Sequence, residues 1–468
     1  MNKTWLLFLV YFISLPVFSG DEFWKWQEDH KKNRLIPDVE LSVDDIQYID
    51  NLKVNWAEVA VKNDRFKPID FPIKLPVKNN IQPKLFNSAK TIQNIITPVE
   101  LLETPYILTK RIAFDFYQHN LKIKDSVNWT MNTDIKSEKD VILYWQYFSS
   151  QSSEILLGQF LMLKETLHLN DWDYAFMLFQ YSKIWQKSLN SQLLQTQYLL
   201  VQSGYKVHIG FDESSLQLLM NTQHEILNEN YVLDERYKRW YVMNFTKDIK
   251  VLSSIKWMNQ SHKKSKEIFE LRMNPDLNLG GQWENKLFNY QIGNEQFDIY
   301  VPFNKTMISH YKTYPILSVS SYVNNEIHNV IKQSIVDQII ENIDINNEEQ
   351  AINFLLNFVQ TLIPNNESLI QSKPKLFQQV VFSGKVSVYE NILLFKALVD
   401  EITGHYMMVV EYEKYLSVGV KLSETHKLKT FHVNLVDYVF ADPSYLNGLL
   451  GEKMPIEENP FVQWHSLY

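Results

Sequence analysis

The sequence predicts a mixed α+β protein, and two kinds of periodicity support that class. Apolar residues make up 45% of the 468 residues and charged residues 21%, so the chain can bury large cores. Apolar side chains recur at helical spacing in segments 138–150, 154–167, 172–185, 191–202, 325–343, 348–362 and 389–403. Extended patterns occupy segments 205–211, 297–301, 406–412, 416–421, 430–434 and 436–442.

The first twenty residues are typical of a cleavable signal peptide. Lys3 supplies a positive charge, segment 5–17 is apolar but short for a membrane span, and Ser19 suits the cleavage site. Segment 21–105 is predicted to be irregular because prolines interrupt it, at Pro37, Pro68, Pro72, Pro76 and Pro83. No later segment reaches about eighteen uninterrupted apolar residues. We therefore expect an exported chain, periplasmic or extracellular, without an integral membrane segment after cleavage.

Two regions are expected between the irregular segment and the C-terminal domain. Residues 106–248 read as helices followed by strands, with Asn170 suited to start one helix and Gly204 suited to end another. Residues 249–323 read as a β-rich linker domain. A Gly-Asn turn at 293–294 joins two extended runs there and predicts a hairpin.

Residues 324–468 are expected to form the last domain. Three helical segments precede four strand candidates, and Gly404 is placed to end the third helix. The apolar positions of segment 389–403 form a wide face that we expect to be buried against an antiparallel sheet. They are Ile392, Leu393, Phe395, Ala397, Leu398 and Val399.

Composition excludes several classes of function. The chain has no cysteine, so it has no disulfide, no thiolate metal site and no cysteine nucleophile. A net charge of −8 argues against nucleic-acid binding. The twelve histidines show no His-x-x-x-His or His-Glu-x-x-His spacing, and no glycine-rich phosphate loop occurs. We therefore expect neither a metal nor a cofactor.

Four stretches of the C-terminal region carry a resemblance to a known family. They are segment 351–364, the Lys373-Pro374 pair, segment 390–402, and segment 441–447 with its Asp-Pro-Ser-Tyr run, which Gly451 and Met454-Pro455 follow. In this order and spacing the chain resembles the transglutaminase-like (papain-like core) proteins of the type exported by Bacteroidetes. The resemblance covers most of 110–460 and implies a C-terminal domain in which a helix packs on an antiparallel sheet.

The resemblance also implies where a catalytic triad would lie. Such enzymes use a cysteine thiolate at a helix N-terminus, a histidine base and an orienting aspartate. Carried over without gaps, these positions are Val388, Tyr415 and Asp442. Valine has no nucleophilic atom, and tyrosine, with an ordinary pKa near 10, is a poor base at neutral pH. We expect these three residues to lie close together as a degenerate triad in which Tyr415 hydrogen-bonds to Asp442. The carboxylate of Asp442 is also expected to cap the turn that follows it.

A relocated nucleophile is the alternative for this domain. Ser383 and Ser387 precede the helix, and the nearest histidines in the sequence are His405, His426 and His432. Each of these histidines is explained more readily by a strand or a loop position than by a role as a base.

The favoured hypothesis is an exported, non-catalytic transglutaminase-like protein that binds a peptide or protein through the former substrate cleft. Two alternatives stay open: a hydrolase or acyltransferase with a relocated, non-cysteine nucleophile, and a structural protein of the cell envelope. The sequence does not indicate an oligomeric state.

Export makes a direct prediction about the mature N-terminus. We expect cleavage after Ser19 or Gly20, because small side chains there follow the apolar run. N-terminal sequencing of the protein recovered outside the cytoplasm measures the cleavage point. An intact Met1 on the exported chain contradicts the prediction.

Overall fold

The computed structural model describes residues 110–125, 127, 129–130, 135–151, 153–212, 215–227, 229–234, 238–245, 256–257, 268–292, 294–363, 374–412, 415–423, 428–452 and 461–466. The predicted signal peptide and the irregular region 21–105 lie outside these residues. The chain is a mixed α+β protein, as the sequence predicts. None of the helices in the described ranges is both long and apolar enough to span a bilayer.

Contacts between residues divide the chain into two compact units. The described residues of the smaller unit are 110–114, 120–125, 127, 151 and 153–159. Strands β1 (Lys110–Phe116) and β2 (His119–Asp125) form a two-stranded sheet whose residues alternate between buried and exposed. The side chain of Gln159 both donates to the carbonyl of Lys124 and accepts from its N–H, at 2.7 Å each. A glutamine thereby completes the outer edge of β2 as a neighbouring strand would.

The larger unit begins with helices whose starts are set by side-chain caps. These helices are α5 (Glu138–Ser149), α7 (Asp171–Trp185) and α8 (Leu189–Gln202), and α6 (Glu154–Thr166) continues into this unit. Asn170 accepts the N–H of Asp173 at 3.0 Å, so it caps α7 as predicted. Gly204, just after α8, has a φ of 94°, the left-handed conformation expected of a glycine that ends a helix.

A five-stranded antiparallel sheet follows α8 in the order β5-β6-β4-β3-β7. Its strands are β3 (Val207–Asp212), β4 (Ser215–Asn221), β5 (Tyr231–Leu233), β6 (Arg239–Val242) and β7 (Lys256–Trp257). Helix α8 packs on β3 and β4. This confirms the predicted succession of helices and then strands in this region.

The predicted hairpin is longer than the sequence indicates. Strands β8 (Trp283–Ile292) and β9 (Glu295–Asn304) pair in register along their whole length. Short helices α9 (Lys305–Tyr311) and α10 (Val319–Tyr322) come next, and Asn304 caps α9. The β-rich character expected of 249–323 is wrong for 268–282, an irregular segment in which one residue, Phe269, forms a bridge.

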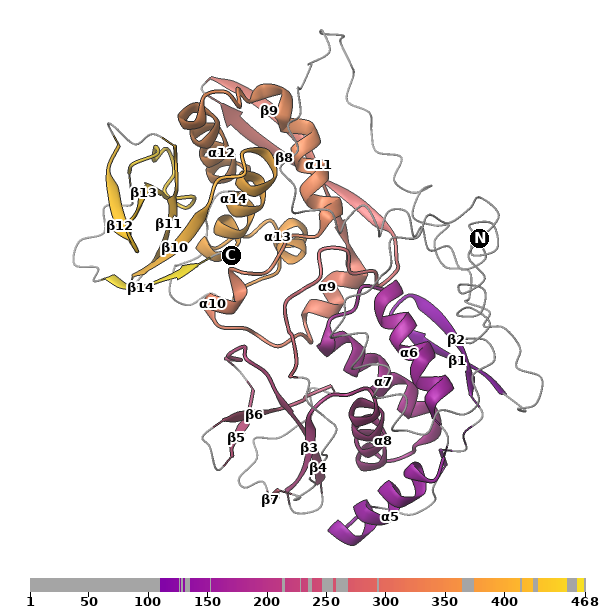
Figure 1. The fold of residues 1–468 in the computed structure, drawn as a ribbon. Helices are drawn as coiled ribbons and strands as arrows, with labels where there is room; N and C mark the ends of the chain where they lie inside the picture. The colour runs from indigo at the N-terminus through magenta and orange to yellow at the C-terminus, as the bar shows by residue number, and fades with distance from the viewer. Residues whose placement is uncertain are drawn as a thin grey trace, which may run out of the picture. The chain divides into compact units, whose positions relative to one another are not determined.

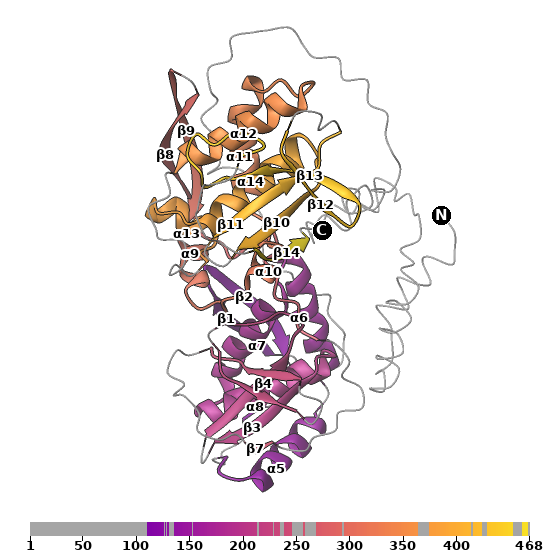
Figure 2. The same ribbon diagram turned by 90° about the vertical axis from the view of Figure 1, so that its left-hand side faces the viewer.

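The C-terminal region places one helix between a sheet and further helices. Helices α11 (Asn329–Ile339), α12 (Glu348–Leu362) and α13 (Phe377–Ser383) precede α14 (Val388–Ile402), which packs against all three (Figure 1). The sheet is antiparallel, in the order β12-β13-β11-β10-β14 (Figure 2). Its strands are β10 (Met407–Tyr412), β11 (Leu416–Val420), β12 (Thr430–Val433), β13 (Val436–Ala441) and β14 (Phe461–Ser466).

Helix α14 is buried as predicted. Ile392, Leu393, Phe395, Leu398 and Val399 are at most 3% exposed and join one core with strands β10 and β11. Ala397 is only partly buried at its margin. Gly404 has a φ of 67° and ends the helix.

Two details of this region differ from the sequence prediction. Helix α11 begins at Asn329 rather than at 325, because the ring of His328 accepts the N–H of Val330 and caps it there. The sequence analysis also missed α9, α10, α13 and β14. Each has at most seven residues, too few for a clear period.

The core position of α14 makes a testable prediction. Phe395→Ala should lower the free energy of unfolding by about 3–5 kcal/mol, because the fully buried ring leaves a cavity. Glu401→Gln on the same helix is the control. Its ion pair with Lys332, at 3.0 Å, is partly exposed and contributes about 1 kcal/mol or less. Chemical denaturation compares the two variants, and equal losses contradict the assigned core.

Candidate functional site

The start of α14 is where the resemblance places a nucleophile, and it is closed to solvent. Val388 is the first residue of the helix and is 1% exposed. It belongs to the main C-terminal core, together with residues of β10, β11 and β13. The position therefore offers neither a reactive atom nor access for a substrate.

Glu390 organises the polar groups at this helix end. Its carboxylate accepts the N–H and the hydroxyl of Ser387, each at 2.6 Å, and the N–H of Lys375 at 2.5 Å. Burial raises the pKa of Glu390, although these hydrogen bonds act in the opposite direction. Ser387 is completely buried and its hydroxyl donates to this carboxylate. These hydrogen bonds fix Ser387 just before the helix, where a substrate cannot reach its hydroxyl.

Tyr415, at the histidine position, packs in an aromatic cluster. Its ring stacks on that of Tyr412, with centroids 4.6 Å apart and planes at 4°. Burial, followed by the proximity of Tyr412 and Asp442, raises the pKa of Tyr415. The expected hydrogen bond from the Tyr415 hydroxyl to Asp442 is not formed among the described residues. The phenol ring fills the site by stacking instead.

Asp442 has the structural role expected of it. Its carboxylate accepts the N–H of Ser444 at 3.0 Å and closes the turn after β13. The side chain of Gln360 in α12 donates to the carbonyl of Asp442 at 3.0 Å, and Asn391 in α14 donates to that of Pro443 at 3.2 Å. Two helices thereby anchor this turn.

The three triad positions are divided between two clusters. Tyr415 lies with Val410 and Tyr412 in a small cluster, whereas Val388 belongs to the main core with Val409. Val409 and Val410 are successive residues of β10, so their side chains point to opposite faces of the sheet. Asp442 is near enough to Tyr415 to affect its pKa. The structure thus associates Tyr415 with Asp442 and places Val388 on the other face.

The other residues of the relocated-nucleophile hypothesis are dispersed. Ser383 ends α13 and is exposed, and its hydroxyl faces the carbonyls of its own turn. His405 lies 4.0 Å from Glu348. His432 is exposed on β12 and pairs with Asp437. His426, like Lys373 and the Met454-Pro455 pair of the resemblance, is outside the described residues.

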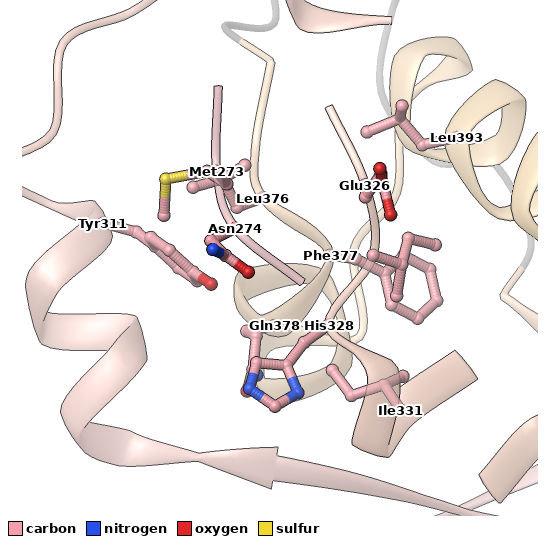
Figure 3. A pocket seen from close by; sticks show the side chains of 11 residues that line it. Met273, Asn274, Tyr311, Glu326, His328, Ile331, Leu376, Phe377, Gln378 and Leu393 are labelled. Atoms are coloured by element: carbon pink, nitrogen blue, oxygen red, sulfur yellow. The ribbon is translucent and has the colours of Figure 1, made fainter. Parts of the chain in front are cut away.

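Two small pockets lie away from the triad positions. One, of about 10 Å³, is lined by side chains that include Tyr311, His328, Gln378 and Leu393 (Figure 3). The other, of about 40 Å³, lies beside Tyr322. Volumes of this size hold a water molecule or two but no organic ligand. Among the residues described here, no group of three or more His, Asp or Glu side chains could hold a metal ion.

Strand β14 presents an exposed aromatic surface that the sequence analysis missed. Among the described strands it pairs only with β10, so it is an edge of the sheet. Phe461, Val462 and Trp464 are 45%, 50% and 45% exposed. The rings of Phe461 and Trp464 lie 4.4 Å apart, and Phe461 meets Tyr412 edge-on at 6.3 Å. The aromatic surface formed by Phe461, Val462 and Trp464 therefore adjoins the Tyr412–Tyr415 stack.

A second cluster of buried polar groups lies far from this sheet in the sequence. His310 lies with Nε2 3.1 Å from Oδ1 of Asp173, and its Nδ1 is 2.7 Å from the hydroxyl of Tyr117. Both Asp173 and His310 are buried, at 0% and 1% exposure. Burial raises the pKa of Asp173, and burial lowers that of His310 to about 3. Both shifts favour the neutral forms of the pair.

No protein-family model, no curated protein and no solved structure matches this chain.

The buried acid predicts a pH dependence that one substitution removes. Because the pKa of Asp173 is raised on folding above its ordinary value of 3.8, the native state holds a proton that the unfolded state loses. The contribution of Asp173 to stability should therefore fall as pH rises above that value, by up to about 1.4 kcal/mol per pH unit until the native pKa is reached.

Asp173→Asn keeps the shape of the neutral acid and cannot ionise. Relative to the natural chain, this variant should gain stability as pH rises above about 4, which thermal melts over a series of pH values measure. Asp400→Asn, at a partly exposed surface pair with Lys396, is the matched control and should show no such trend. A pH-independent difference for Asp173→Asn contradicts the assignment.

Proposed function

We propose that the chain is an exported, non-catalytic relative of the transglutaminase-like proteins and that its C-terminal domain binds an extended peptide. The order of elements supports the relationship: a buried helix, α14, precedes an antiparallel sheet, and Asp442 directly follows β13. The proposal for the domain rests on one observation. Valine and tyrosine occupy the positions of thiol and imidazole, both buried, while an exposed aromatic edge strand adjoins the Tyr412–Tyr415 stack.

The absence of thiol chemistry follows from residue types alone. The chain has no cysteine, and Val388 cannot form a covalent intermediate. Tyr415 with a raised pKa is a weaker acid than free tyrosine and does not supply the proton shuttle of an imidazole near pH 7. A hydrolase built on Ser387 is disfavoured because its hydroxyl is buried against Glu390.

An extended peptide is the ligand that suits strand β14. An edge strand offers backbone N–H and C=O groups to another strand, and proteins usually protect such edges with charges or proline. The sequence Phe-Val-Gln-Trp-His-Ser of β14 contains no lysine, acid or proline. Its exposed side chains can therefore contact alternate residues of an added strand, which is the usual mode of strand addition. The ligand would then lie along the edge next to Tyr412 rather than in a closed cleft.

The binding proposal is tested with a charged residue on the edge. Peptides of about eight residues that alternate valine and threonine between terminal lysines serve as probes, with anisotropy of a fluorescent label as the measurement. Val462→Lys should weaken binding about tenfold or more, equivalent to about 1.4 kcal/mol, because lysine opposes strand addition.

Leu435→Lys is the matched control at the other side of the same sheet. Leu435 is fully exposed in the turn between β12 and β13, so the same new charge should leave binding within about twofold. Failure of the natural chain to bind any such peptide, or equal effects of both variants, overturns the proposal. Self-association that Val462→Lys abolishes would instead identify a second copy as the partner of this edge.

A further inference from the structure

Three segments that are distant in the sequence place a serine, a histidine and a glutamate in contact, with the histidine between the other two. Nδ1 of His224 lies 3.1 Å from the hydroxyl oxygen of Ser321, and Nε2 of His224 lies 2.5 Å from Oε1 of Glu270. Ser321 is in α10, His224 follows β4, and Glu270 lies in the irregular segment before β8. None of these residues belongs to the transglutaminase-like site.

Backbone hydrogen bonds hold the histidine segment on both sides. Phe269 donates to the carbonyl of Asn221 at 2.9 Å, which ties the start of the segment to the strand-like residues beside Glu270. Ser318 donates to the carbonyl of Glu225 at 2.8 Å, which ties its end to the residues before α10. The imidazole thus sits in a short segment fixed between the two residues that it contacts.

The charge state of Glu270 decides which ring nitrogen carries the proton. Burial acts to raise the pKa of Glu270, but hydrogen bonds from His224 and Arg272 outweigh it and lower the pKa well below the usual range. The Arg272 side chain donates twice, from Nε and Nη2 at 3.2 Å each, and its backbone N–H donates at 2.9 Å. An ionised carboxylate only accepts, so Nε2 must donate to it. In the neutral ring Nδ1 then has a lone pair, which accepts the hydroxyl hydrogen of Ser321.

Ser321 is more exposed than His224, which suits a nucleophile and its base. His224 is 7% exposed, whereas Ser321 is partly exposed. The Tyr117–His310–Asp173 cluster has a similar order of groups, but its acid differs. Asp173 is wholly buried with a raised pKa, and neither carboxyl oxygen has a hydrogen-bond partner within the described residues. Of the two clusters, the one at His224 combines an ionised acid with a partly exposed serine.

We propose that Ser321 is a nucleophile activated by His224, with Glu270 as a positioning residue, and that it reacts with carboxylic esters. The Ser321 oxygen bonds to the ester carbonyl carbon while its proton passes to Nδ1 of His224. The carbon–oxygen bond to the alcohol breaks, and the alcohol leaves with that proton. Water then attacks the acyl-serine, and its proton returns through His224 to the serine oxygen, so the products are a carboxylic acid and an alcohol. This activity would be additional to peptide binding by the C-terminal domain.

Covalent labelling of the full mature chain tests the nucleophile. A fluorophosphonate probe should modify the natural chain once, and peptide mass mapping should place the label on Ser321. Ser321→Ala should abolish labelling. Ser423→Ala is the matched control, because the Ser423 hydroxyl also donates to a carboxylate, Glu348 at 2.7 Å, on an exposed surface. This variant should label at the natural rate.

Glu270 is tested by a conservative pair of substitutions. Glu270→Gln should slow labelling about a hundredfold, because an amide can donate to Nε2 and leave Nδ1 without its lone pair. Glu270→Asp, which keeps the charge, should restore part of the rate. Nitrogen NMR of His224 should report the proton on Nε2 in the natural chain, and thermal melts should confirm that all variants fold. An unlabelled but folded natural chain, a label on another serine, or a proton on Nδ1 overturns the proposal.

Discussion

The buried carboxylate of Glu390 is the interaction on which the C-terminal domain depends. It gathers the two donors of Ser387 and the N–H of Lys375 at one point, at 2.5–2.6 Å. Helix α14 starts there and then contacts α11, α12, α13 and β11. An unpaired polar group at this depth would cost about 1–3 kcal/mol, and more if it were charged. The three hydrogen bonds therefore fix where the central helix begins, and the packing of its neighbours follows from that point.

The same arrangement closes the start of α14 to a substrate. The free N–H groups at a helix N-terminus stabilise an anion, and a thiolate nucleophile at that place benefits from them. Here the carboxylate of Glu390, in the first turn, binds the buried Ser387 that precedes the helix through its N–H and its hydroxyl. Val388, the first residue of the helix, adds a buried apolar side chain to the core. The helix end is thus used for stability, and the polar groups that remain nearby, such as Asp442, serve turns and helix contacts.

Local signals account for the parts of this fold that could be predicted from the sequence. Asn170 before α7, glycines after α8 and α14, and the Asp442 turn each act over fewer than about six residues, and the structure contains all of them. The stacking of Tyr415 on Tyr412 could not be predicted, because the choice between stacking and a bond to Asp442 depends on the strand geometry. Long-range clusters are harder still. His224 and Ser321 are 97 residues apart, and neither has a periodic or motif signal.

The His310–Asp173 and His224–Glu270 clusters show that the surroundings of a carboxyl group decide its charge state. Within the described residues neither carboxyl oxygen of Asp173 has a hydrogen-bond partner to offset complete burial, so the neutral form is favoured and the pair adds no charge to the core. Glu270 is less buried and receives donors from both His224 and Arg272, so the charged form is favoured. An ionised acid can only accept a hydrogen bond, so it fixes which nitrogen of the histidine that touches it carries the proton. Of these two clusters, the donors around the acid therefore make the one at Glu270 the better suited to hold a histidine for proton transfer.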